Sequence, residues 1–166
     1  NEPKTYTLDG KPWQPHNYVP MSETRVTMRS ALAKSVNLAT VDLAMQIGIN
    51  RVIDTASAFQ FTTPLKPYPS LALGSSEVIP LELARAYCAF AADGVLPNPL
   101  SLKEVLDEKG QMLERRHSEI KSVTTPAKAF LITAMLRSSI EEGTTRPLKG
   151  MGISFPVASK TGTTSN

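Results

Sequence analysis

The strongest constraint on this sequence lies near its carboxyl end, where the chain reads Lys-Thr-Gly-Thr from Lys160 onwards. On a β-strand, alternate residues share a face, so the hydroxyls of Thr161 and Thr163 would point the same way. Gly162 has no side chain, which lets a ligand approach the backbone closely. The charge of Lys160 and the amide of Thr163 would both favour a negatively charged group. The pattern predicts that the end of segment 153–160 is a strand with an anion-binding edge, although the same residues also suit a charged surface turn.

A second polar box, Ser35-Val36-Asn37, lies far upstream. On a tight turn, Ser35 and Asn37 would direct both polar side chains into one cleft. A hydroxyl there relays a proton between two amines, and a carboxamide holds a substrate amide. The alternative is a junction between two helices in which Asn37 caps the second one. The two interpretations are compatible, because a capping residue can also contact a ligand.

Composition indicates an ordered globular chain and argues against nucleic acid as a partner. Of the 166 residues, 41% are apolar and 20% are charged, and the net charge is +3. A chain of this length buries enough apolar surface for one core. The basic residues form no stripe and are not interleaved with aromatic residues, so no nucleic-acid surface is predicted. No segment has the length and apolarity of a helix that crosses a bilayer.

The residues that most often bind metals are few and scattered. The histidines, His16 and His117, have no Cys or carboxylate partners at ligand spacing, so no metal site is predicted. Cys88 is the only cysteine, which excludes an internal disulfide. It lies in the apolar stretch Ala86-Tyr87-Cys88-Ala89-Phe90, where we expect it to be a small buried hydrophobic residue.

Hydrophobic spacing and capping residues predict a mostly helical block with little sheet, that is, an α+β fold. The predicted helices run from 28 to 34 after a Thr27 cap, from an Asn37 cap to Gly48, from 50 to 59, from 80 to 93, and from a start at Thr125-Pro126 to about 142. The buried side of the last helix is expected to carry Phe130, Leu131, Ala134 and Met135. Residues 101–106 and 111–115 flank a turn that ends at Gly110, which predicts a β-hairpin.

The two boxes resemble part of the signature of penicillin-binding proteins and serine β-lactamases. Over essentially all 166 residues, the chain resembles part of the transpeptidase domain of a class A, bifunctional penicillin-binding protein. Further stretches carry the resemblance: Asp9-Gly10-Lys11-Pro12-Trp13, Arg29-Ser30-Ala31-Leu32, Pro69-Ser70-Leu71-Ala72-Leu73-Gly74, Pro80-Leu81-Glu82-Leu83-Ala84 and Glu142-Gly143-Thr144. Two residues depart from the family pattern, which often has Thr in place of Ile79 and Gly in place of Ser159.

The resemblance implies a D,D-transpeptidase that cross-links peptidoglycan stem peptides through a serine acyl-enzyme and is acylated by β-lactams. In that reaction Ser35 would pass a proton towards the leaving D-Ala, and Asn37 would orient the donor amide. Lys160, Thr161 and Thr163 would hold the donor carboxylate. The mechanism therefore predicts that the Ser35 hydroxyl and the Lys160 amine face one cleft, within direct or one-water hydrogen-bond reach. The implied partners are stem peptides ending in D-Ala-D-Ala and β-lactams, with no cofactor, metal or nucleic acid. The implied location is the extracytoplasmic, periplasmic face of the cell membrane.

The nucleophile of the family lies in a Ser-x-x-Lys box that precedes both other boxes. The only such spacing here, Ser118 to Lys121, falls between them and follows the polar run Arg115-Arg116-His117, so we interpret it as a coincidence. We therefore expect residues 1–166 to be a partial transpeptidase domain, truncated at both ends and inactive alone. The nucleophile, the membrane anchor and the glycosyltransferase domain of the parent protein would lie outside it.

Two other functions use the same residues. A β-lactamase or D,D-carboxypeptidase would employ the boxes for hydrolysis, and a non-catalytic penicillin-binding-like protein would keep them as a scaffold. The stretches 9–18 and 69–84 resemble the bifunctional transpeptidases specifically, which favours transpeptidation over hydrolysis.

Overall fold

The structure is a computed structural model that describes residues 1–162. Its helices are α1 (Met28–Ala33), α2 (Asn37–Ile47), α3 (Ile49–Ala58), α4 (Pro80–Ala91) and α5 (Pro126–Glu141), with 3-10 helices η1 (Pro69–Leu73) and η2 (Arg146–Met151). Its strands are β1 (Tyr6–Leu8), β2 (Lys11–Trp13), β3 (Val95–Pro97), β4 (Glu104–Leu106), β5 (Met112–Arg115) and β6 (Ile120–Ser122). The strands form three antiparallel pairs, β1–β2, β3–β6 and β4–β5. The predicted α+β class is confirmed.

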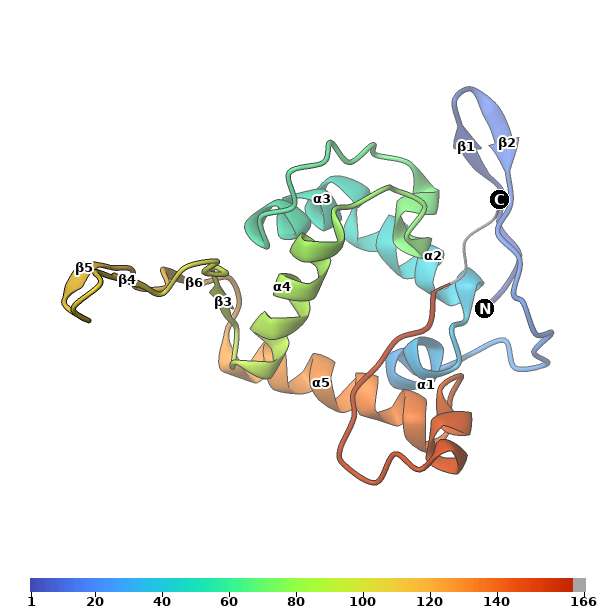
Figure 1. The fold of residues 1–166 in the computed structure, drawn as a ribbon. Helices are drawn as coiled ribbons and strands as arrows, with labels where there is room; N and C mark the ends of the chain where they lie inside the picture. The colour runs from blue at the N-terminus through green and yellow to red at the C-terminus, as the bar shows by residue number, and fades with distance from the viewer. Residues whose placement is uncertain (163–166) are drawn as a thin grey trace.

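The helices are arranged around α5, which α1 and α4 contact at opposite ends (Figure 1). A cluster of buried apolar residues joins the end of α3 to α4 and β3. Its members are Phe59, Ala86, Ala89 and Leu96, with Phe61, Phe90 and Val123 packed against them. The β4–β5 hairpin projects away from this core, whereas α1, α2 and the segment after η2 lie together at the other end of the molecule (Figure 1).

Helix starts follow the predicted caps at two of three positions. The Thr27 hydroxyl accepts a hydrogen bond from the Ser30 amide (3.1 Å), and Thr125 begins α5 in the same way. The prediction that Asn37 caps its helix was wrong. The oxygen that caps α2 comes from Asn17, which accepts a hydrogen bond from the Leu38 amide (3.0 Å). A distant side chain replaces the local cap because the amino-terminal segment packs against this helix end.

Two burial predictions were also wrong. On α5, Phe130 and Leu131 are 68% and 57% exposed, and the buried residues are Ala129, Leu136, Ser138, Ser139 and Ile140. Three of these five residues are small, which lets α1 and α4 pack closely onto the helix. Cys88 is exposed, since α4 turns Ala86 and Ala89 towards the core instead.

The strand predicted at the end of segment 153–160 does not form among the described residues. A strand requires a neighbouring strand to complete its ladder, and here the nearest backbone partner is a helix. The Ser159 amide donates to the Leu136 carbonyl of α5 (3.3 Å). By contrast, the predicted hairpin is present as β4 and β5, and its turn ends at Gly110 with φ of 76°. The short pairs β1–β2 and β3–β6 were not predicted.

The helices and the potential metal ligands of residues 1–162 bear on membrane and metal binding. None of the helices found there combines the length and the apolar content that crossing a bilayer requires. Within the same residues, His, Cys, Asp and Glu side chains do not gather in threes that could hold a metal ion.

Candidate active site

The two polar boxes meet in space. The Lys160 Nζ donates a hydrogen bond to the Ser35 Oγ at 2.8 Å, although the two residues are 125 positions apart in the sequence. Figure 1 shows how this happens: the segment after η2 turns back across α5 and passes α1 towards the start of α2. This distance lies within the range expected for direct proton exchange between the two side chains.

Ser35 occupies the short connection between α1 and α2, where its backbone is strained. Its φ is +55°, a left-handed conformation that residues with a side chain seldom adopt. Flanking hydrogen bonds hold it there, from the Ser35 amide to Leu32 O (3.2 Å) and from the Val36 amide to Ala31 O (2.9 Å). Strained serines of this kind are characteristic of functional sites. This turn and its hydrogen bonds place the Ser35 hydroxyl beside the Lys160 amine.

Asn37 begins α2 two residues later, and its amide group is engaged by the protein. The Asn37 Nδ2 donates to the backbone oxygen of His16 at 2.7 Å. No hydrogen bond within residues 1–162 joins it to Ser35 or Lys160. The side chain is half-buried at the junction of the amino-terminal segment with α2. Its role in orienting a substrate amide stays a prediction.

The residues after Lys160 lie on an exposed edge. The Lys160 Nζ also donates to the Thr161 carbonyl at 2.9 Å, and the hydroxyls of Thr161 and Thr144 are 3.0 Å apart. Apart from its chain neighbours, no atom of residues 1–162 lies within 4 Å of the position that a Cβ on Gly162 would take, so these residues leave the backbone open to a ligand there. Thr163 falls outside the described residues 1–162.

Burial lowers the pKa of the Lys160 amine below the ordinary value of a lysine. Among the described residues its hydrogen-bond partners are hydroxyl and carbonyl oxygens, with no carboxylate to hold the charged form. A larger fraction of neutral amine is therefore present than for a solvated lysine at the same pH. The ammonium form also gives up its proton to the adjacent Ser35 oxygen more readily than a solvated lysine would.

Sequence reasoning missed a set of hydroxyls behind Lys160. Ser139 of α5, Thr145 before η2 and Ser159 are joined by hydrogen bonds of 2.7 to 2.9 Å. The one hint in the sequence was the stretch Glu142-Gly143-Thr144, which lies between Ser139 and Thr145 and resembles the family pattern, but no role was assigned to it. Serine and threonine are common at exposed positions, so the sequence alone did not mark this cluster.

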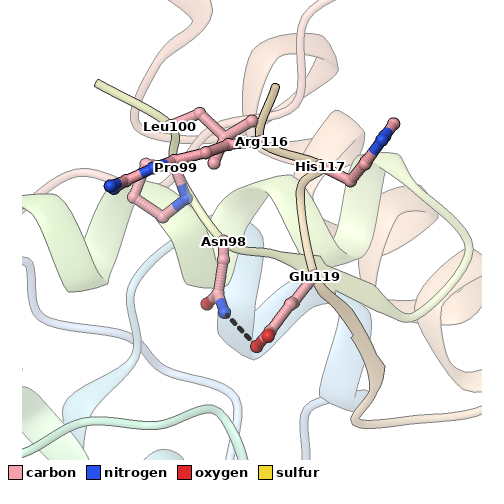
Figure 2. A pocket seen from close by; sticks show the side chains of 6 residues that line it. All are labelled: Asn98, Pro99, Leu100, Arg116, His117 and Glu119. Atoms are coloured by element: carbon pink, nitrogen blue, oxygen red, sulfur yellow. Dashed lines mark hydrogen bonds between the residues drawn. The ribbon is translucent and has the colours of Figure 1, made fainter. Parts of the chain in front are cut away.

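The serine and lysine at Ser118 and Lys121 lie elsewhere. The Ser118 hydroxyl donates to the Asn98 backbone oxygen (2.7 Å), and Lys121 belongs to β6. A shallow pocket beside them is lined by Asn98, Pro99, Leu100, Arg116, His117 and Glu119, and Figure 2 shows Asn98 and Glu119 pointing towards each other. None of these residues belongs to the Ser35–Lys160 pair.

Comparison with known proteins agrees with this arrangement. The family model described as "Penicillin binding protein transpeptidase domain" matches residues 1–166. The chain belongs to this family. It is 39% identical over 155 residues to penicillin-binding protein 1A of Aquifex aeolicus, covering 93% of this chain and 21% of that protein. It is 30% identical over 166 residues to penicillin-binding protein 1B of Haemophilus influenzae, covering 99% and 21%. The predicted resemblance is confirmed, and the chain spans about a fifth of the length of these curated relatives.

Solved structures show the same fold. Penicillin-binding protein 1A from Haemophilus influenzae superposes with a TM-score of 0.79 at 24% identity, covering 85% of this chain and 26% of that one. The D,D-transpeptidase domain of a peptidoglycan glycosyltransferase from Eggerthella lenta gives a TM-score of 0.77 at 19% identity, covering 99% and 47%. The short sheets and the helical block are thus a piece of the transpeptidase fold.

Proposed function

We propose that the protein containing this chain is a serine D,D-transpeptidase that cross-links peptidoglycan stem peptides. The observation that carries the proposal is the 2.8 Å contact between Lys160 and Ser35, made by two boxes of a family to which the whole chain belongs. The contact joins a hydroxyl to an amine whose pKa is lowered by burial. Such a pair suits the transfer of a proton during acyl transfer.

Each described site residue has a role in this reaction. A nucleophilic serine elsewhere in the protein attacks the carbonyl between the two D-Ala residues and forms an ester, and the D-Ala amine leaves. The Ser35 hydroxyl gives its proton to that amine and takes up, through Lys160, the proton that the nucleophilic serine loses. The Lys160 charge and the Thr161 hydroxyl bind the terminal carboxylate, and Gly162 leaves room for it. We propose the same carboxylate-binding role for Thr163, and donor orientation for Asn37.

β-Lactams would acylate the same serine because their ring amide and carboxylate imitate the donor. Related solved structures include acyl-enzyme complexes of penicillin-binding protein A from M. tuberculosis with imipenem and with ceftriaxone. Because peptidoglycan lies outside the membrane, we place the domain on the extracytoplasmic face. A glycosyltransferase activity elsewhere in the protein, and the assignment of residues 1–166 as one partial domain, belong to the same proposal.

The proposal is tested on the full-length protein with a fluorescent penicillin. Loss of a well-placed electrostatic donor lowers catalysis about 10²–10³-fold, so Lys160→Ala should slow acylation by that factor. The thermal unfolding midpoint should change little, because Lys160 is only half-buried. Equal losses of stability and acylation would assign Lys160 a structural role. Continuous turnover of nitrocefin, in place of a stable acyl-enzyme, would show a hydrolase instead.

A further inference from the structure

Three hydroxyls form a ring next to Lys160, of which those of Ser139 and Thr145 are buried and that of Ser159 is half-buried. The Ser139 and Thr145 oxygens are 2.7 Å apart, the Ser139 hydroxyl donates to the Ser159 backbone oxygen at 2.8 Å, and the Ser159 hydroxyl donates to Thr145 Oγ1 at 2.9 Å. Ser139 is completely buried and Thr145 is 8% exposed. No other segment contributes a side chain to these three bonds.

The three hydroxyls of the ring can satisfy one another as hydrogen-bond donors and acceptors. Each hydroxyl carries a single hydrogen to donate. If Ser139 donates to the Ser159 carbonyl and Ser159 donates to Thr145, the hydrogen of Thr145 is left for Ser139. In this arrangement every donor has one acceptor. A fully satisfied buried network holds its members in one geometry.

The ring lies next to a segment that has few backbone hydrogen bonds within residues 1–162. The residues leading into Lys160 are not paired with a strand within the described structure, and Ser159 has one backbone bond to α5. Because Ser159 precedes Lys160 directly, the ring sets where the lysine side chain begins. The neighbouring turn is held against α1, since the Thr144 amide donates to the Ala33 carbonyl (3.1 Å). Ala33 is two residues from Ser35. The ring and the adjoining turn therefore contact the segments that carry both Ser35 and Lys160.

We propose that Ser139, Thr145 and Ser159 are positioning residues that hold the Lys160 amine against the Ser35 hydroxyl. The proposal rests on the proposed function, because it assumes that this amine takes part in acyl transfer. It gives a use to Ser159, which stands where the family often has glycine: the serine adds a hydroxyl that closes the ring. The three residues act through Lys160 and need not touch the substrate.

The test measures acylation of the full-length protein by a fluorescent penicillin, corrected for folded fraction. Removal of a hydrogen bond of this kind costs about a factor of ten, so Ser139→Ala and Thr145→Val should each slow acylation about tenfold. Thr145→Ser keeps the hydroxyl and should restore the wild-type rate. Ser138→Ala is the matched control, because Ser138 is equally buried on the same helix but bonds to Arg29 and Ala134.

A double variant shows whether the effect of the ring on acylation depends on Lys160. In a Lys160→Ala background, Ser139→Ala should cause no further loss. The proposal is overturned if Ser139→Ala and Thr145→Val acylate at the wild-type rate, if Thr145→Ser is as slow as Thr145→Val, or if Ser138→Ala is equally slow. A loss that persists without Lys160 would also overturn it. If Lys160→Ala itself acylates normally, the proposed function fails, which is a different result from failure of the ring alone.

Discussion

The two ends of this molecule are held together in different ways. At the site end, hydrogen bonds join residues far apart in the sequence, such as Lys160 with Ser35 across 125 positions and Thr144 with Thr161 across 17. In the β4–β5 hairpin they are local, as between Arg116 and Glu114 two positions apart. The hairpin therefore forms from its own turn, whereas the site exists only when distant segments are packed together.

The largest expected effect comes from two glycines. A Cβ on Gly143 would lie 2.1 Å from the Ala33 oxygen, and one on Gly94 would lie 2.3 Å from the Thr124 oxygen. Each alanine variant should lose about 3 kcal/mol of stability through overpacking. Since Ala33 is two residues from Ser35, Gly143→Ala should also slow acylation about 100-fold through misplacement of the site.

Gly94→Ala is the control for this prediction, because its clash lies between the end of α4 and the start of α5. Both variants are compared by thermal unfolding and by the acylation rate of the folded fraction. A Gly94→Ala protein that also acylates about 100-fold slower would remove the distinction between the site end and the rest of the molecule.

A second prediction concerns pH. Burial lowers the pKa of Lys160 when the protein is folded, so between this value and the ordinary lysine pKa the unfolded chain binds more protons. Stability should therefore rise with pH in that window. The free energy of unfolding is measured against pH for the wild type and for Lys160→Met. As the pH increases, the free energy of unfolding of the wild type should rise relative to that of the variant. A difference that is flat or falls with pH would contradict burial of the amine.

A smaller effect is expected in the hairpin turn. The Asp107 carboxylate accepts hydrogen bonds from the amides of Lys109 and Gln111, both at 2.8 Å. Asp107→Ala should weaken the hairpin by about 1 kcal/mol. Hydrogen exchange of the β4 and β5 amides should accelerate while acylation stays at the wild-type rate. Slower acylation would show that the hairpin and the site are coupled.

The smallest effect is expected on the hairpin surface. Leu113 lies in β5 and is 67% exposed. Leu113→Ser should change stability by about 0.5 kcal/mol or less, because no packed contact is lost. Chemical denaturation measures this directly. A loss several times larger would mean that the hairpin packs against another part of the protein.

The same contrast explains what the sequence could predict. The hairpin prediction was correct because the residues of its turn determine it locally. The predicted helix caps at Thr27 and Thr125 were correct for the same reason. The proximity of Ser35 to Lys160 was expected only through the family resemblance. The exposed Phe130, the cap from Asn17 and the Ser139–Thr145–Ser159 ring depend on which helices pack together, and single-sequence patterns carry no such information.

The central claim is that Ser35 and Lys160 act as one unit, and a double-mutant cycle tests it most directly. Acylation by a fluorescent penicillin is measured for the full-length protein and for Ser35→Ala, Lys160→Ala and the double variant. Because residues in direct contact are not additive, the double variant should be no slower than Lys160→Ala alone. Losses that multiply, as for two independent residues, would contradict the claim and separate the two boxes functionally.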